Sequence, residues 1–370
     1  MYAVRRLASD EWLQLDDRWN GLSRGVPFQR LEWLAPWWRH YRPGELCVLA
    51  VEDSEGRSVA YTPWYFEQTR GGGRVIRSLG SGEVCSDYVS ILCRVGKEQE
   101  VARTLGEFLS RNEQQLGWDL IHLEGIDGED PVVPLLLEQF SHQGHPVIDR
   151  PVHRCWRLPL PESETSLLAL QSKSHRKQLR RFQTRIFDTQ RGVLRRADSA
   201  ESFEFAWNEL VSLHQRRREQ LGQPGCFASG RFAAFLREAA ENMRRAGLLH
   251  LYWLELEGSP VAAEFHLAGP GMLYAYQSGI DPERLDEEPG SLITLAILRD
   301  AISECRQEID FLRGDEPYKA HWRAVPRQAY DWRIVSRKAS ARIRHYLWRA
   351  ADQARCWVKQ GLFSSPSEPV

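Results

Sequence analysis

The chain has 370 residues, a length that suggests two domains of ordinary size. Its 49 Lys and Arg nearly balance 50 Asp and Glu, and its 27% charged and 42% hydrophobic residues are typical of a folded globular protein. These numbers exclude a disordered or fibrous chain and argue against a generic binder of polyanions. The charge is nevertheless segregated: residues 171–218 hold 12 Lys and Arg against 5 Asp and Glu, and residues 337–370 hold 7 against 2.

Seven cysteines are scattered along the chain, without a C-x-x-C pair and without histidines at zinc-binding spacing. This pattern favours reduced thiols in a cytoplasmic protein over a disulfide framework or a metal site. The first residues lack the apolar segment of a signal peptide, and the longest apolar runs fall short of the ~18 residues that a membrane-spanning helix needs. We therefore expect a soluble cytoplasmic protein.

The first half of the chain alternates strand and helix patterns. A strand pair joined by a turn is followed by a helix and then by a further strand, expected at residues 46–51, 58–66, 98–112 and 119–125. Prolines then cluster at positions 146, 151, 159 and 161, which predicts a boundary near residues 150–160. We predict an N-terminal domain over 1–155, a second domain over 156–336 and a tail over 337–370.

The second half begins with helical patterns, which predict helices over 164–192, 202–221 and 231–245. The series seen in the first half then returns, with strands at 248–256 and 261–267, a helix at 291–305 and a strand at 310–314. Even the turns align, as Glu55-Gly-Arg-Ser-Val-Ala60 and Glu257-Gly-Ser-Pro-Val-Ala262. A tandem duplication of one α/β unit explains this repetition, and coincidence is the alternative. The pattern of apolar and basic residues over 338–360 predicts a basic amphipathic helix.

Glu264 and His266 lie two residues apart on the second of these strands. Strand alternation places them on one face and Val261, Phe265 and Leu267 on the other. The polar face is either the solvent side of an antiparallel strand or the wall of a cleft with a general base.

The strand over 272–279 carries Tyr274 and Tyr276 on one face, where they either line a groove or pack in a core. The helix that follows is expected to start at Ser291 as its N-cap, directly after Gly290. Its exposed backbone N–H groups are a weak signal for a phosphate site.

Two further stretches are rich in groups that bind ligands. Residues 310–323 gather acidic, basic and aromatic side chains after a strand, either as a functional loop or as an ordinary solvated one. The basic helix over 173–185 has three interpretations: a solvated surface, a binding surface for tRNA or another nucleic acid, or a contact for an anionic cofactor or substrate.

Four segments, taken in order, resemble the FemAB-like branch of the GNAT acyltransferases, which includes the CelD-like acetyltransferases of cellulose biosynthesis. They are Ser174-His-Arg-Lys-Gln-Leu-Arg-Arg181, the Glu-Gly-x-Pro-Val-Ala hairpin at 257–262, Pro289-Gly-Ser-Leu-Ile-Thr294 and Asp310-Phe-Leu-Arg-Gly-Asp-Glu-Pro-Tyr-Lys319. The resemblance covers about residues 165–325.

This resemblance implies an α/β (α+β) protein with tandem GNAT-like folds, each a mixed, mostly antiparallel sheet flanked by helices. It implies an N-acyltransferase that moves an acyl group, typically acetyl, from acyl-CoA to an amine, without a permanently bound cofactor or a metal. An amine of envelope or exopolysaccharide synthesis is the expected acceptor. The strands at 272–279 and 309–313 should part to admit the pantetheine arm.

The resemblance also assigns roles to residues. It implies Glu264 as base and Tyr318 as acid, with Asp315 as a further catalytic candidate. It implies acyl-CoA contacts by a group that spans the helix start, one strand and the basic helix: Gly290, Ser291, Leu292, Tyr276, Arg176, Lys177 and Arg180. It implies substrate contacts by His266, Tyr274, Arg313 and Lys319.

Two departures keep other functions open. The glycine-rich acetyl-CoA signature of the family is absent, and Glu288-Pro-Gly-Ser-Leu292 stands in its place. FemAB relatives use aminoacyl-tRNA instead of CoA, so a tRNA-dependent transferase is the second hypothesis. A non-catalytic binding module of an envelope-synthesis system is the third. The helix over 338–360 would then either contact anionic lipid peripherally or pack on the body.

Overall fold

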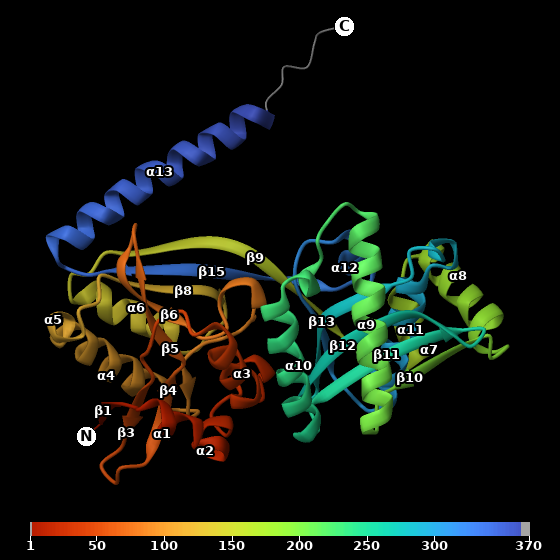
Figure 1. Cartoon of the computed structure of the whole chain (residues 1–370), viewed down its shortest axis with the longest axis horizontal. Helices are drawn as coiled ribbons and strands as arrows, with labels where there is room; N and C mark the ends of the chain where they lie inside the picture. The colour runs from red at the N-terminus through yellow and green to blue at the C-terminus, as the bar shows by residue number, and fades with distance from the viewer. Residues whose placement is uncertain (1, 364–370) are drawn as a thin grey trace, which may run out of the picture.

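The structure is a computed structural model that describes the backbone of residues 2–363 and the side chains of residues 2–353. Two α/β halves lie side by side and share one long sheet (Figure 1). The N-terminal half contains β1 (Ala3–Arg6), α1 (Ser9–Leu13), α2 (Asp16–Asn20), α3 (Leu31–Tyr41), β2 (Glu45–Leu46), β3 (Leu49–Glu52), β4 (Ser58–Thr62), β5 (Trp64–Thr69), β6 (Gly73–Ser78), β7 (Leu92–Cys93), α4 (Glu98–Arg111), α5 (Glu113–Leu116), β8 (Leu120–Asp127) and α6 (Val133–His142).

The rest of the chain begins with a strand that runs through both halves and ends in a long helix. Its elements are β9 (Val147–Pro159), α7 (Glu164–Leu170), α8 (Lys173–Phe182), β10 (Gly192–Arg196), α9 (Ala200–Gln220), α10 (Gly230–Arg245), β11 (Leu249–Leu256), β12 (Ser259–Gly269), β13 (Met272–Ile280), α11 (Pro289–Ser303), β14 (Glu308–Arg313), α12 (Pro317–His321), β15 (Val325–Val335) and α13 (Ala339–Phe363).

The large sheet has the order β10-β11-β12-β13-β14-β9-β15-β8-β6-β5-β2, and a smaller sheet has the order β1-β3-β4-β7. Within the described residues, neighbouring strands are antiparallel except for the pairs β13–β14 and β6–β8. Each parallel pair is bridged by a helix, α11 in one half and α4 in the other, as a crossover between parallel strands requires. The predicted tandem, mostly antiparallel α/β fold is confirmed.

The two halves share strands and core. The boundary predicted between residues 155 and 156 falls inside β9, which pairs with β14 of one half and, through β15, adjoins β8 of the other. Trp33 of α3 contacts Phe235 of α10 and Tyr276 of β13, with ring centroids 5.0 Å apart in both contacts. One hydrophobic core therefore crosses from half to half.

The helix predicted over 164–192 is wrong as a single element. Gln171 has extended backbone angles (φ −79°, ψ 155°), and the Oγ of Ser172 accepts a hydrogen bond from the backbone N–H of His175 at 3.3 Å. A serine that caps one helix competes with continuation of the helix before it, so the segment divides into α7 and α8.

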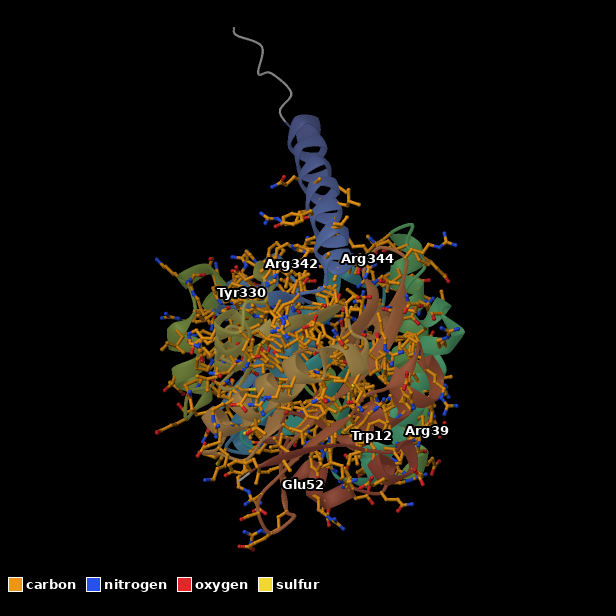
Figure 2. All side chains as sticks on the ribbon, turned by 90° about the vertical axis from the view of Figure 1, so that its left-hand side faces the viewer. Trp12, Arg39, Glu52, Tyr330, Arg342 and Arg344 are labelled. Carbon is orange, nitrogen blue, oxygen red and sulfur yellow. The ribbon has the colours of Figure 1, made fainter. Side chains whose placement is uncertain are left out.

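Helix α13 confirms the helix predicted near 338–360 and stands away from the body for much of its length (Figures 1 and 2). Near its start, Ala341 is buried against Val75, Leu120 and Val335. The predicted end of the tail, 364–370, lies outside the described residues. None of the described helices combines the length and apolar composition that crossing a bilayer requires.

Candidate active site

Strands β13 and β14 open into a fork. They run parallel and pair at only three positions, Met272 with Glu308, Leu273 with Ile309 and Tyr274 with Asp310. Beyond the last pair β13 continues to Ile280 and β14 to Arg313 without pairing to each other. The predicted parting of these strands is confirmed. It leaves the edge of β13 beyond Tyr274 without a strand partner on this side, where an extended ligand would find hydrogen-bond partners.

A bulge in β13 accompanies the fork. The register with β12 shifts between Phe265, which pairs with Gln277, and His266, which pairs with Ala275, so Tyr276 has no cross-strand partner. Such an extra residue bends a strand and increases its twist. The bend begins next to the last β13–β14 pair, and β14 is irregular at the same place, because its register with β9 shifts between Asp310 and Arg313 and Leu312 has φ +55°.

Helix α11 starts beside the end of β13. It begins at Pro289, with Glu288 as its N-cap at φ +57°, so the prediction of Ser291 as N-cap is wrong and Ser291 lies in the first turn. Gly290 is half-buried next to Ile280, whereas Leu292 is fully buried in the core. The N-terminal backbone of α11 therefore adjoins the outer end of the fork.

Glu264 and His266 lie on the face of the sheet that packs against α8 and α11. The Nε2 atom of His266 lies 2.6 Å from Oε2 of Glu264, and the imidazole ring meets Tyr252 edge-on at 5.6 Å. His266 is 1% exposed, and its Nδ1 has no hydrogen-bond partner among the described residues. Glu264 retains some exposure, with 14% of its side chain accessible. The Glu264 carboxylate is thus partly accessible and is positioned by its contact with the buried imidazole of His266.

Tyr318 lies on the other side of the fork, in α12 directly after β14. Its ring meets Phe311 edge-on at 5.8 Å and is nearly half exposed. Loss of solvation, followed by the charges of Glu264 and Glu316, raises the pKa of Tyr318 above its usual value. The phenol therefore keeps its proton at neutral pH, and it lies close enough to Glu264 for the two to interact electrostatically.

Three further candidate site residues form hydrogen bonds or ion pairs with other residues of the chain. The Nζ of Lys319 donates hydrogen bonds to the carbonyls of Leu312, Arg313 and Gly314 at 2.8–3.1 Å, and the side chain is 2% exposed. Its ammonium thus holds the turn between β14 and α12. Exposed Asp315 accepts hydrogen bonds from Arg154 and Trp156 of β9. Arg313 pairs with the buried Asp87 of the other half, at 2.7 Å.

Tyr274 and Tyr276 lie on the opposite face of the sheet from Glu264. The hydroxyl of Tyr276 donates to the carbonyl of Val84 at 2.7 Å, and both rings contact Phe28 in the core that joins the halves. The structure therefore does not bring these tyrosines together with Glu264 and Tyr318.

The basic helix α8 has a mixed set of roles. Arg176 donates to the carbonyls of Leu168, Ala169 and Gln171, so it caps the end of α7. Lys177 and Arg180 are exposed and form no ion pair with any residue whose side chain is described. Helix α8 is tied to the start of α11 by its other polar residues, because Gln178 donates a hydrogen bond to the Glu288 carboxylate and Arg181 forms an ion pair with it.

A buried carboxyl group at the apex of the fork was not among the predicted site residues. Asp310 is fully buried and accepts hydrogen bonds from the Tyr88 hydroxyl at 2.5 Å, from Arg157 Nε at 2.9 Å and from the Leu312 N–H at 2.7 Å. Burial raises the pKa of Asp310 to about 6. Tyr88 is 222 positions away in sequence, so no local pattern could reveal the contact.

Asp87, His153 and Cys155 each place one ligand atom within 4.8 Å of the others, near the same interface. Arg313 forms an ion pair with the Asp87 carboxylate, and His153 lies within hydrogen-bond distance of the same group at 3.1 Å. These contacts already satisfy the carboxylate, which disfavours a metal there.

Comparisons with known proteins match this description. Residues 173–320 match the family model of the acetyltransferase (GNAT) domain. The whole fold resembles FemX (TM-score 0.62, 10% identity, covering 90% of this chain and 97% of FemX). It also resembles L-PGS from Bacillus licheniformis (TM-score 0.51, 14% identity, covering 91% and 96%) and a conserved protein of unknown function from Bacteroides thetaiotaomicron (TM-score 0.55, 11% identity, covering 91% and 100%). No curated protein sequence matches. Residues 173–320 are thus similar to the acetyltransferase (GNAT) domain family, within a chain whose overall fold is similar to that of FemX.

Proposed function

We propose that this protein is an N-acyltransferase that moves an acyl group, in the first instance acetyl, from acyl-CoA to an amine. The observation that carries the proposal is the fork, where β13 and β14 pair over three residues and then separate beside the start of α11. The unpaired strand edge would hold the pantetheine arm. The amides of Gly290 and Ser291, with exposed Lys177 and Arg180, would hold the pyrophosphate, whereas the Leu292 amide already donates to the carbonyl of Glu288.

In this reaction Glu264 accepts a proton from the amine, directly or through one water, while His266 holds the carboxylate in place. The amine nitrogen attacks the thioester carbonyl and forms a tetrahedral intermediate, which collapses with cleavage of the C–S bond. The protonated phenol of Tyr318 then donates its proton to the departing thiolate. The products are an amide and free CoA, and the enzyme regains its starting protonation when the proton passes from Glu264 to Tyr318 through solvent.

An aminoacyl-tRNA donor is the second candidate. It is supported by exposed Lys177 and Arg180 on α8, whose positive charge would suit a nucleic-acid phosphate as well as a CoA phosphate. A donor of this kind predicts binding that weakens steeply with salt, because each neutralised phosphate releases condensed counterions.

The proposed setting is the cytoplasm, with an amine of envelope or exopolysaccharide synthesis as acceptor. One face of α13 carries exposed apolar side chains, those of Ile343, Tyr346 and Leu347. The exposed Arg342 and Arg349 lie next to this face. This face would contact anionic lipid peripherally. Flotation of the full-length protein with anionic vesicles, compared with Leu347→Asp, tests that contact, and equal flotation of both proteins would refute it.

Thermal unfolding and turnover test the function itself. Acetyl-CoA, a longer acyl-CoA and bulk tRNA are each added to the purified protein, and CoA thiol release is followed with a panel of amines. Stabilisation by acyl-CoA together with amine-dependent thiol release supports the proposal. Salt-sensitive retention on immobilised tRNA without any effect of acyl-CoA supports the second candidate. A protein that responds neither to acyl-CoA nor to tRNA would be a non-catalytic binding module.

The double variant Lys177→Ala/Arg180→Ala should reduce the thermal stabilisation by acyl-CoA. Lys173→Ala on the same helix is the matched control and should leave that stabilisation unchanged.

A further inference from the structure

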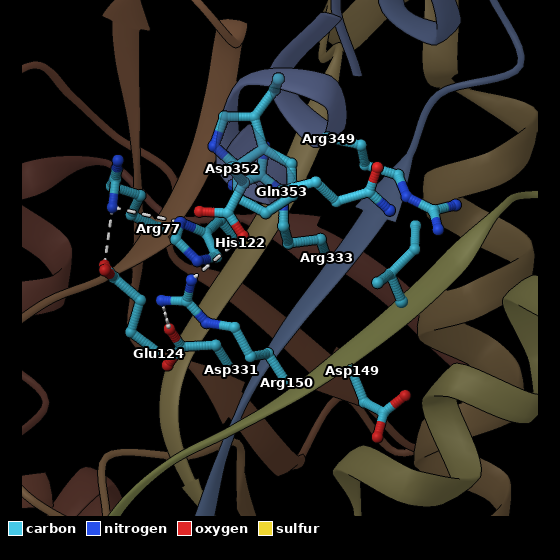
Figure 3. Close-up of a pocket in the computed structure, with 12 residues that line it drawn as sticks. Arg77, His122, Glu124, Asp149, Arg150, Asp331, Arg333, Arg349, Asp352 and Gln353 are labelled. Atoms are coloured by element: carbon cyan, nitrogen blue, oxygen red, sulfur yellow. Dashed lines mark hydrogen bonds and ion pairs between the residues drawn. The ribbon is translucent and has the colours of Figure 1, made fainter. Parts of the chain in front are cut away.

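The N-terminal half contains a second parallel strand pair whose ladder is as short as that of the first fork, although here β6 ends at Ser78, one residue beyond its last pair with β8. Strands β6 and β8 run parallel and pair at three positions, Val75 with Leu120, Ile76 with Ile121 and Arg77 with His122. Beyond Arg77 and His122 the two strands do not pair, although β8 continues to Asp127. A cavity of about 490 Å³ opens at this place, closed on one side by α13 (Figure 3).

Four arginines and four carboxylates line this cavity, and two of the arginines, Arg333 and the exposed Arg349, form no ion pair with any residue whose side chain is described. Arg77 pairs with Glu124 at 2.6 Å, and Arg150 lies within ion-pair distance of Asp331 and Asp352. Arg333 of β15 forms no ion pair with any residue whose side chain is described, and its buried Nε has no acceptor there. A half-buried charge in this condition is costly, so its presence calls for an anion from outside the chain.

The guanidinium of Arg333 is also held in a fixed orientation. Its carbon lies 3.8 Å from the centroid of the Trp348 ring, at cation–π distance. A cation over an aromatic ring engages the ring face and not the N–H edge of the guanidinium, and the buried Nε on that edge has no acceptor among the described residues. That edge is the part of an arginine that binds a carboxylate or phosphate with two parallel hydrogen bonds.

His122 supplies a further donor. Its Nδ1 lies 3.3 Å from Nη1 of Arg77, and because an arginine only donates, this nitrogen accepts. Burial, followed by the charges of Arg333, Arg77 and Arg150, lowers the pKa of His122 to about 2, so the ring is neutral and its proton is on Nε2. Burial, followed by the charges of Arg77 and Arg150, lowers the pKa of Arg333 to about 10, against the opposing effect of Glu124 and Asp331.

We propose that this pocket binds the carboxylate or phosphate group of a small organic anion, held by Arg333 and by the Nε2–H of His122, with the apolar part of the ligand against Trp348 and Ile148. The site is separate from the fork between β13 and β14 and does not depend on the acyl-transfer reaction. Since Trp348 belongs to α13, the bound anion would also fasten that helix to the sheet.

The test uses thermal unfolding of the full-length protein in sodium phosphate, sodium acetate and sodium chloride at equal ionic strength. A phosphate or acetate effect that exceeds chloride is expected, with a rise in Tm of about 2 °C at about ten times Kd. Arg333→Met, which keeps the apolar stem, should lose the oxyanion-specific rise. Arg103→Met, on the exposed surface of α4, is the matched control and should keep it.

His122→Phe provides a second variant should Arg333→Met fail to fold, and it should weaken the oxyanion effect without removing the guanidinium. Phosphate also stabilises proteins by exclusion from their surface, but that effect is equal in wild type and variants. A rise that is the same for chloride, or that persists unchanged in both pocket variants, overturns the proposal. A response to phosphate alone identifies a phosphorylated ligand, and a response to acetate alone identifies a carboxylic acid.

Discussion

The Nε2 atom of His266 lies 2.6 Å from the Oε2 atom of Glu264, two residues earlier on β12. His266 is buried, whereas the Glu264 carboxylate is partly accessible. The imidazole therefore fixes the position of the carboxylate without contacting a ligand itself. An orienting group behind a catalytic base is a recurring arrangement in enzymes. In the proposed reaction, Glu264 is therefore the group on which acyl transfer depends most.

Replacing Glu264 with Gln should lower kcat by about 10²- to 10⁴-fold, because the amide cannot accept the proton of the amine. The Kd of acyl-CoA should hardly change, since the thioester donor does not need that carboxylate. Steady-state kinetics and calorimetric titration measure the two quantities. A variant with normal kcat would remove Glu264 from the mechanism.

Replacing Tyr318 with Phe should lower kcat by about 10- to 100-fold and leave KM for acyl-CoA nearly unchanged. The expected loss is smaller than for Glu264, because a thiolate is a stable leaving group and needs less help from an acid. Turnover equal to wild type would show that solvent protonates the thiolate.

Replacing Lys319 with Met should lower the free energy of unfolding by about 2–4 kcal/mol, because three backbone carbonyls lose a charged donor in a buried turn. Because the same turn places Tyr318, kcat should fall as well. Urea unfolding measures the first effect. The exposed Lys173→Met is the control and should stay within about 0.5 kcal/mol of wild type. Equal stability of the two variants would contradict the structural role of Lys319.

Asp310 should make stability depend on pH in a direction opposite to that of most carboxylates. Its pKa is about 6 in the folded protein, above the usual value of 3.8, so between these values the folded state holds a proton that the unfolded state has released. Stability from this group is therefore complete below pH ~4 and is lost as the pH rises through 6, by up to about 3 kcal/mol. Asp310→Asn should remove this component.

Urea unfolding of wild type and Asp310→Asn from pH 4 to pH 7 measures the difference, with the exposed Asp286→Asn as control. Parallel curves for wild type and Asp310→Asn would show that the carboxyl group is ionised in the folded protein throughout this range.

The sequence predicts local features of the site better than contacts between distant segments. Alternation places Glu264 and His266 on one face of β12, and the order of strands around α11 follows from the repeated pattern of the two halves. Lys319 looks like a ligand contact in sequence, yet it binds the carbonyls of its own turn. The partnership of Asp310 with Tyr88 depends on packing between halves that no spacing encodes. Gln171 interrupts a helical pattern because Ser172 caps the next helix.

Hydrogen–deuterium exchange in the presence of acetyl-CoA tests the central claim most directly, because it reports on the strand edge itself. We expect slower exchange at residues 275–280 of β13 and at 290–291 of α11, where the thioester arm and its pyrophosphate would accept hydrogen bonds from the backbone. Unchanged exchange in both segments at saturating acetyl-CoA would contradict binding of an acyl-CoA at this fork.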